Sequence, residues 1–321
     1  MVGLSGTVSF GFGQMDQNQT GPVISHPAGD FVTVGSHKIW YESEGQGEPL
    51  LLIPGGPGSS HDYFHPFFSA LSNQYRVIYY DPFGTGKSDH AKNPSEYSLK
   101  QEIEEVEELR KALGIDQWNV FGHSWGGVVA QGYVTKYPGP VKKVVLSDCL
   151  VSGKSYQDTN DRALRLMADL FPDNWKKMEE LHAKGLKSTS SELSQAEPDI
   201  FAIAFFYQRE NTSKLVPAGE NTMNPEISIA IMGKDMDFKL GGEAANFDWH
   251  AGLRSLRVPI LIVNGRADLV VTPRQAEELA SAAPGAKLVI FEHSGHMSFA
   301  EETAGTMKTI GDFLSAAMSK N

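Results

Sequence analysis

The chain alternates short, fully apolar runs with segments patterned as amphipathic helices. Runs of this length with no polar alternation suit strands that are buried on both faces of a sheet. Strands and helices that alternate in this way predict an α/β fold, with a mostly parallel, doubly wound sheet and helices on both of its faces. The apolar runs are residues 49–55 (PLLLIPG), 75–81 (YRVIYYD), 118–122 (WNVFG), 142–148 (KKVVLSD), 258–265 (VPILIVNG) and 286–293 (AKLVIFEH). An earlier segment, residues 31–45, reads as a hairpin with its turn near Gly35.

Residues 150–249 interrupt this alternation with helix-like segments and no convincing strand. An insertion of this kind between two core strands predicts a helical cap. We therefore expect three parts. These are a flexible leader over residues 1–24, an α/β core over residues 25–149 and 250–321, and the cap over residues 150–249.

Charge and cysteine content exclude several classes of partner. The 321 residues carry a net charge of −11, and no basic stripe is present, so neither nucleic acid nor a membrane surface is expected as a partner. A single cysteine, Cys149, excludes an intramolecular disulfide. The leader lacks the basic start and continuous apolar stretch of a signal peptide, which favours a cytoplasmic location. The oligomeric state is left open.

Residues 122–126 (GHSWG) carry the clearest chemical signal. They match G-x-S-x-G between an expected strand and an expected helix, the context of a nucleophile elbow. A serine at such a turn is held in a strained backbone conformation, with its hydroxyl projecting above the sheet edge. The glycines on either side allow strand and helix to pass closely. We predict Ser124 as a catalytic nucleophile.

A serine nucleophile needs a general base, and the base needs an acid that orients it. Asp268 and His296 follow the last two apolar runs, in the chain order Ser, Asp, His that is typical of this arrangement. Both should therefore reach the sheet edge from which the serine projects. Asp148 and His293 are the alternative acid and base, and His123 is predicted to be structural.

An acyl-transfer site also needs backbone N–H groups that stabilise an oxyanion. We expect one from Trp125, and one from the glycine-rich loop after the first apolar run, with Gly56 favoured over Gly55. Residues 86–88 (GKS) resemble the end of a phosphate-binding loop. However, Asp81 stands where the first glycine of that motif belongs, so a nucleotide site is rejected and Asp81 is expected to cap the turn.

No metal or cofactor is expected. His61 and His65 have the spacing of one helix face, but the sequence offers no third ligand beside them.

Several motifs together resemble the proline iminopeptidase family of α/β-hydrolases. Residues 54–58 (PGGPG) are similar to its HGGPG, residues 81–88 (DPFGTGKS) to its D-x-R-G-x-G-x-S, and residues 122–127 (GHSWGG) to its G-x-S-x-G-G. The resemblance covers most of residues 30–315. It implies a serine peptidase or amidase that removes an N-terminal residue, often proline. Two positions differ: Pro54 stands for the family's histidine and Phe83 for its arginine.

The resemblance also implies that acidic side chains of the cap hold the free α-amine of the substrate. Residues 232–238 (MGKDMDF) are similar to a family stretch in which an acid precedes phenylalanine, which makes Asp237 one amine-binding carboxylate. Glu210 is the nearest candidate for the second.

These observations favour a serine hydrolase that acts through an acyl-enzyme on a small molecule or short peptide. The first hypothesis is an aminopeptidase or amidase that releases a small N-terminal residue such as proline. The second is a carboxylesterase or lactone hydrolase whose pocket does not hold an amine, and the third is a binding or sensor protein with slow turnover. Chemistry that uses an aspartate nucleophile is disfavoured by Ser124.

Overall fold

An eight-stranded sheet forms the centre of the molecule, with strand order β1-β2-β4-β3-β5-β6-β7-β8. The computed structural model describes residues 26–215 and 223–317, so the expected leader over residues 1–24 lies outside the described part. The strands are β1 (Gly29–Val34), β2 (His37–Glu44), β3 (Glu48–Ile53), β4 (Tyr75–Tyr80), β5 (Trp118–His123), β6 (Val141–Ser147), β7 (Ile260–Gly265) and β8 (Lys287–Phe291). β2 pairs antiparallel with β1 and β4, and all pairs from β4 to β8 are parallel. The predicted α/β fold with a mostly parallel sheet is confirmed.

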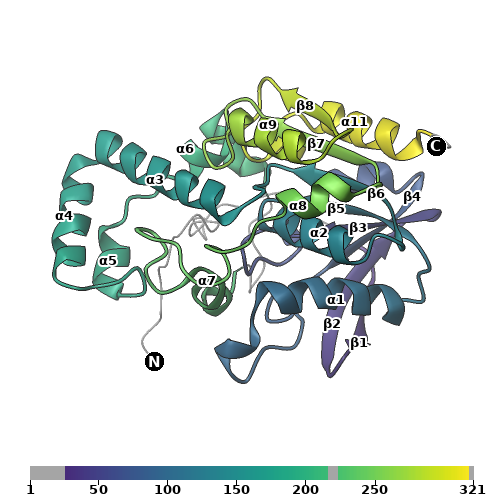
Figure 1. Ribbon diagram of the computed structural model, residues 1–321, viewed down its shortest axis with the longest axis horizontal. Coiled ribbons are helices and arrows are strands. Elements are labelled where there is room, and N and C mark those ends of the chain that lie inside the picture. Colours follow the sequence, from purple (N-terminus) through teal and green to yellow (C-terminus); the bar gives the residue numbers. More distant parts are fainter. Residues whose placement is uncertain (1–25, 216–222, 318–321) are drawn as a thin grey trace.

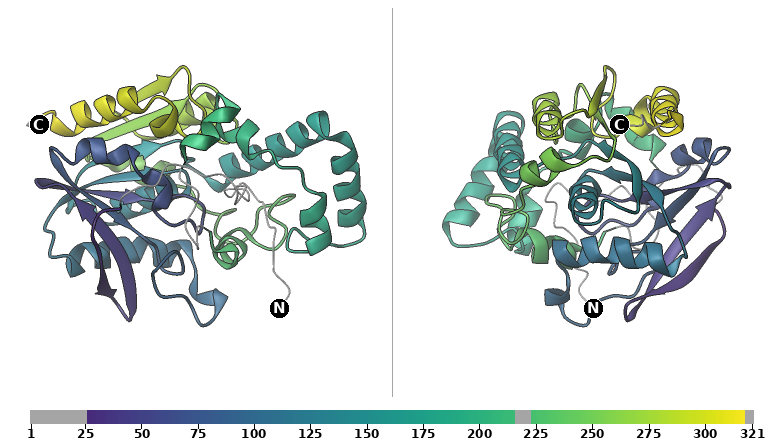
Figure 2. Two further views of the ribbon diagram at one scale, coloured as in Figure 1. Left: turned by 180° about the vertical axis from the view of Figure 1, so that it is seen from behind. Right: turned by 45° about the vertical axis from the view of Figure 1, so that its right-hand side comes forward.

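Helices cover both faces of this sheet (Figures 1 and 2). They are α1 (Leu99–Ala112), α2 (Trp125–Lys136), α8 (His250–Ser255), α9 (Pro273–Ala282), α10 (Ser298–Glu301) and α11 (Thr303–Ser315). α1, α2, α8 and α9 contact one another in series on one face, whereas α11 packs beside the 3₁₀ segment η2 (Phe67–Leu71). None of the helices in the described residues is long and apolar enough to cross a membrane.

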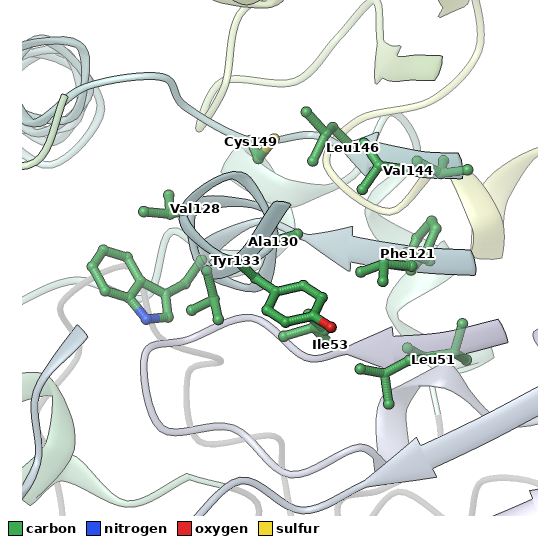
Figure 3. Close-up of a cluster of buried hydrophobic side chains, with 14 of the residues drawn as sticks. Leu51, Ile53, Phe121, Val128, Ala130, Tyr133, Val144, Leu146 and Cys149 are labelled. Carbon is green, nitrogen blue, oxygen red and sulfur yellow. The ribbon is translucent and has the colours of Figure 1, made fainter. Parts of the chain in front are cut away.

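The hydrophobic core packs closely around α2, which follows the nucleophile elbow. Figure 3 shows side chains of β3, β5 and β6 gathered around this helix, among them Leu51, Phe121 and Leu146, which are fully buried. A Cβ atom added to Gly127 would lie 2.4 Å from the Cβ of Cys149. Only glycine fits there, so the first turn of α2 is seated directly against the loop after β6.

Between β6 and β7 the chain forms a layer of helices. These are α3 (Gly153–Leu170), α4 (Pro172–Ala183), α5 (Ser191–Ala196), α6 (Phe201–Phe205) and α7 (Pro225–Met232). Part of the layer has an apolar cluster of its own, with Met167, Met178, Leu193 and Ile200 at its centre. α3, α4 and α5 project from one end of the molecule, far from the C-terminal end of α11 (Figures 1 and 2). We call the helices α3–α7 and their connections the cap.

The cap leaves and rejoins the core through two segments that lie side by side. Ser152 and Asp248 form an isolated antiparallel bridge. Around it, the N–H of Gly153 donates to the carbonyl oxygen of Phe247 at 2.9 Å, and the N–H of Trp249 donates to that of Val151 at 3.1 Å. The two segments therefore make a short antiparallel stem.

Candidate active site

Ser124 lies between the end of β5 and the start of α2, in a sharp turn. Its backbone has φ 53° and ψ −121°, a left-handed conformation that residues with a Cβ atom rarely adopt. Strand and helix approach so closely that a Cβ atom on Gly122 would lie 2.4 Å from the carbonyl oxygen of Gly126. A Cβ atom on Gly126 would in turn lie 2.2 Å from the carbonyl oxygen of Ile53. The glycine pattern thus permits the strained turn that was predicted from the sequence.

The structure brings His296 and Asp268 together at the carboxyl edge of the sheet. Nδ1 of His296 lies 2.8 Å from Oδ2 of Asp268, and both side chains are fully buried. The other carboxylate oxygen of Asp268 accepts hydrogen bonds from the N–H groups of Val270 and Val271 at 2.7 and 2.8 Å. The carboxylate is therefore fixed in place. Within the described residues, Nε2 of His296 is buried and has no hydrogen-bond partner.

His123, next to the serine in sequence, connects this loop to the interior. Its Nε2 lies 2.9 Å from the carbonyl oxygen of His296, and its Nδ1 lies 2.9 Å from the Tyr63 hydroxyl. Complete burial lowers the pKa of His123 well below its usual value, so the ring is neutral. One ring nitrogen donates to the His296 carbonyl and the other accepts from Tyr63. This agrees with the structural role expected for His123.

The two alternative residues take other positions. Asp148 is fully buried beside Asp268, but its carboxyl group accepts from the N–H of Gly265 at 2.9 Å and from the Ser147 hydroxyl at 2.7 Å. Burial, followed by the neighbouring charge of Asp268, raises the pKa of Asp148 well above its usual value. This raised pKa favours the protonated form of Asp148. His293 is exposed, and its ring packs edge-on against Tyr207.

The hydrogen bonds of the glycine-rich loop distinguish between the two glycines predicted as oxyanion donors. The N–H of Gly55 donates to the Tyr63 hydroxyl at 2.7 Å, which removes it as a donor to substrate. Gly56 has φ 120°, a conformation suited to glycine. Trp125 begins α2, and its indole N–H donates to Glu102 at 2.7 Å, which holds the side chain in place. This geometry is compatible with the predicted preference for Gly56 over Gly55 as a donor.

The expected pair of cap carboxylates needs a correction. Glu210 lies on the exposed 3₁₀ segment η4 (Arg209–Lys214). Asp237 instead interacts with Glu197, whose pKa is raised well above its usual value by burial and then by the charge of Asp237. Burial raises the pKa of Asp237 to about 7. Its Oδ1 atom is inaccessible and, among the described residues, unpartnered, while its N–H donates to the Ser188 hydroxyl.

The sequence carried no signal for Glu197. It stands forty residues before Asp237 and directly after α5, where an acid reads as ordinary surface. Leu193 and Ala196 of α5 share an apolar cluster with Phe238, which follows Asp237, and this brings the two charges into interaction.

Glu301 is a second residue that the sequence did not single out. Its carboxylate accepts from the backbone N–H groups of Tyr207 and Gln208 at 3.0 and 3.2 Å, and from the Asn211 amide at 2.7 Å. It also accepts from the N–H of Gly295 at 2.7 Å. Glu301 thus joins the cap segment around residues 207–211 to the residue that precedes His296.

Fold and site together define an α/β-hydrolase. The family model described as "alpha/beta hydrolase fold" matches residues 48–303. The chain is 30% identical to a proline iminopeptidase of Heyndrickxia coagulans, over 86% of this chain and 93% of the relative. The chain belongs to the proline iminopeptidase family of hydrolytic enzymes.

Solved structures show the same fold. A proline iminopeptidase of Mycobacterium smegmatis superposes with a TM-score of 0.70 at 22% identity, over 89% of this chain and 97% of that one. An esterase from Exiguobacterium antarcticum superposes with a TM-score of 0.65 at 21% identity, over 90% of this chain and 100% of that one.

Proposed function

We propose that the chain is a serine aminopeptidase that releases a small N-terminal residue, such as proline, from a short peptide or amide. The observation that carries the choice of a free-amine substrate is the pair of half-buried carboxyl groups of Asp237 and Glu197 in the cap, both with a raised pKa. The family relatives named proline iminopeptidases support the same choice.

In the proposed mechanism, Oγ of Ser124 attacks the scissile carbonyl while Nε2 of His296 takes its proton. Asp268 holds the imidazole by its Nδ1–H and stabilises the positive charge that forms. The backbone N–H groups of Trp125 and Gly56 stabilise the oxyanion. His296 then gives the proton to the leaving amine, and a water molecule activated by the same imidazole hydrolyses the acyl-enzyme.

Asp237 and Glu197 act as the amine-binding carboxylates in this proposal. Two neighbouring half-buried carboxyl groups with raised pKa values cannot both ionise at low cost, so the empty pair retains a proton. A substrate ammonium group supplies the missing positive charge, and both groups can then ionise. The pair would therefore select substrates with a free α-amine and reject N-blocked ones.

A carboxylesterase or lactone hydrolase is the second candidate, supported by two positions. Pro54 and Phe83 replace a histidine and an arginine of the family motifs. Phe83 is buried at 3% exposure, and its ring packs against Tyr97. An apolar residue at this place can hold no carboxylate or amide of a peptide.

A paired assay separates the two candidates. Proline and alanine p-nitroanilides, free and N-acetylated, are compared with p-nitrophenyl acetate and butyrate. Cleavage of the free-amine anilides alone, with KM raised at least about tenfold in Asp237→Asn and Glu197→Gln, supports the aminopeptidase. Glu210→Gln is the matched control and should leave KM unchanged. Turnover of the esters without the anilides would contradict the proposal and favour the esterase.

A further inference from the structure

Four side chains lie together around Glu42 on β2, and all of them are distant from Ser124 in sequence. Oε2 of Glu42, on β2, lies 3.1 Å from Nδ1 of His26, 3.3 Å from Nε2 of His61 and 3.4 Å from Nε2 of His65. All four ligand atoms lie within 4.8 Å of one another. The sequence pointed to His61 and His65 but offered no third ligand. The fold supplies two, from residues distant in the chain.

The hydrogen bonds of His61 show which ring nitrogen faces the cluster. Its Nδ1 lies 2.6 Å from Oδ1 of Asp81, and that carboxylate also accepts from the N–H groups of His61 and Lys87. Nδ1 therefore carries a hydrogen, which leaves the lone pair of Nε2 for the cluster. A cation between that lone pair and the Glu42 carboxylate makes this contact favourable.

The directions of the contacts favour one shared cation. Nε2 of His61 and Nε2 of His65 are both buried, yet among the described residues neither has a hydrogen-bond partner, although Glu42 lies within 3.4 Å. Their lone pairs do not point at the carboxylate oxygen. For His61 and His65 this is the orientation of ligands that share a central cation, while Nδ1 of His26 contacts Oε2 of Glu42 directly at 3.1 Å.

The three distances from Oε2 of Glu42 to the imidazole nitrogens agree with a tetrahedral site. Zinc binds imidazole nitrogen and carboxylate oxygen at about 2.0–2.1 Å, and a tetrahedron of that radius has edges of about 3.3 Å. We propose that His26, Glu42, His61 and His65 form a zinc-binding site. Three imidazoles and one carboxylate fill all four positions, so the site is structural and leaves none for substrate.

Groups around the four residues orient them as the outer shell of a metal site does. Asp81 accepts a hydrogen bond from Nδ1 of His61, so that its carboxylate orients the histidine as an outer-shell carboxylate orients a zinc ligand. The Trp40 indole N–H donates to the other oxygen of Glu42 at 3.3 Å. The ring of Tyr79 stacks on His65, with ring centres 4.1 Å apart.

Bound zinc would fix the loop that supports the oxyanion glycines. The ligands His61 and His65 flank Tyr63, whose hydroxyl accepts the N–H of Gly55. Zinc would therefore tie the N-terminal segment at His26 and the edge of β2 to this loop.

The test is metal titration of the full-length protein after removal of metal with a chelator and dialysis. Zn²⁺ is titrated in competition with a chromogenic chelator, and Co²⁺ replaces it for absorption spectroscopy. We expect about one equivalent of Zn²⁺ and the intense visible bands of tetrahedral Co²⁺. His26→Ala and Glu42→Gln should weaken Zn²⁺ binding at least ~100-fold, and Asp81→Asn about 10–100-fold. His90→Ala removes an exposed histidine outside the cluster and should bind as the unaltered chain does.

A second group of three, Asp148, Asp268 and His296, is also close enough to hold a cation. Asp268→Asn controls for it and should leave the tight Zn²⁺ equivalent in place. Loss of Zn²⁺ binding in Asp268→Asn with retention in His26→Ala would overturn the proposal, as would the absence of tight binding to the unaltered chain. His26 is partly exposed, so its alanine variant decides the question even where Glu42→Gln does not fold.

Discussion

At the scale of single residues, the serine turn is strained and the two buried aspartates beside it have different partners. Asp268 accepts hydrogen bonds from two backbone N–H groups and contacts His296. Burial and the neighbouring charge of Asp268 raise the pKa of Asp148, which favours its neutral form. The two acids that the sequence offers are therefore not equivalent.

The roles of these acids can be separated by substitution. Asp268→Asn should lower kcat by about 10⁴-fold, because the amide stabilises the wrong imidazole tautomer. Asp148→Asn keeps the neutral form and should change kcat less than about tenfold. Steady-state kinetics on whichever substrate is turned over provides the measurement. Equal losses in both variants would make Asp148 the partner of His296.

The nucleophile has its own test. Ser124→Ala should lower turnover by about 10⁶-fold and abolish labelling by a fluorophosphonate, while the fold is retained. Circular dichroism checks the fold. Residual activity near that of the unaltered chain would contradict the assignment of Ser124.

Glu105 links stability to pH. Burial raises the pKa of Glu105 to about 7, against the hydrogen bonds from the Phe83 N–H and the Gln101 amide, which favour the ionised form. Because the pKa of Glu105 is higher in the folded chain than in the unfolded chain, its contribution to stability is fully present below about pH 4.5. This contribution is lost as the pH rises through 7. The loss is of the order of 3 kcal/mol by pH 8.

Denaturant unfolding at several pH values measures this effect. Glu105→Gln should flatten the dependence of the unfolding free energy on pH between 5 and 8, whereas the exposed Glu277→Gln should not. An unchanged slope in Glu105→Gln would show that Glu105 ionises without cost.

At the scale of secondary structure, Glu301 at the end of α10 couples the cap to the loop that carries His296. Two contacts join the same elements, because the N–H of His296 also donates to the carbonyl oxygen of Phe205 at 2.8 Å. The position of the His296 loop therefore depends on α6 and η4.

Loss of this carboxylate should affect both stability and turnover. Glu301→Gln leaves at least one backbone N–H without an acceptor, which costs about 1–3 kcal/mol, and it should lower kcat more than it raises KM. Glu292→Gln is the matched control, because Glu292 is exposed nearby and pairs with the surface residue Arg266. A change confined to the unfolding free energy would restrict Glu301 to a structural role.

The strands, the serine turn and the contact between His296 and Asp268 were predictable for a physical reason. Strands buried on both faces are continuous apolar runs, and residues that follow parallel strands meet at one edge. Glu197 and Glu301 were not, since each acquires its partner through contacts between distant elements. The same is true of His26 and Glu42, which join His61 and His65 only when β2 packs beside the loop after β3.

At the scale of the whole molecule, the proposed chemistry and the proposed selectivity lie in different parts of the chain. Ser124, Asp268 and His296 belong to the core, whereas Asp237 and Glu197 belong to the cap. Exchange of the cap carboxyl groups should therefore alter which substrates are bound and leave reaction with the fluorophosphonate intact.

The antiparallel stem at Ser152 and Asp248 has a consequence for how such enzymes diversify. Because the chain leaves and re-enters the core at one point, the segment between these two positions can differ without changing the sheet. Recombination that replaces everything beyond the stem would keep Ser124, Asp268 and His296, and would deliver a new specificity where the new cap restores the contacts of Phe205 and residues 207–211 with the His296 loop. The cap can in this sense be exchanged as a unit, and the stem is the place where it joins the core.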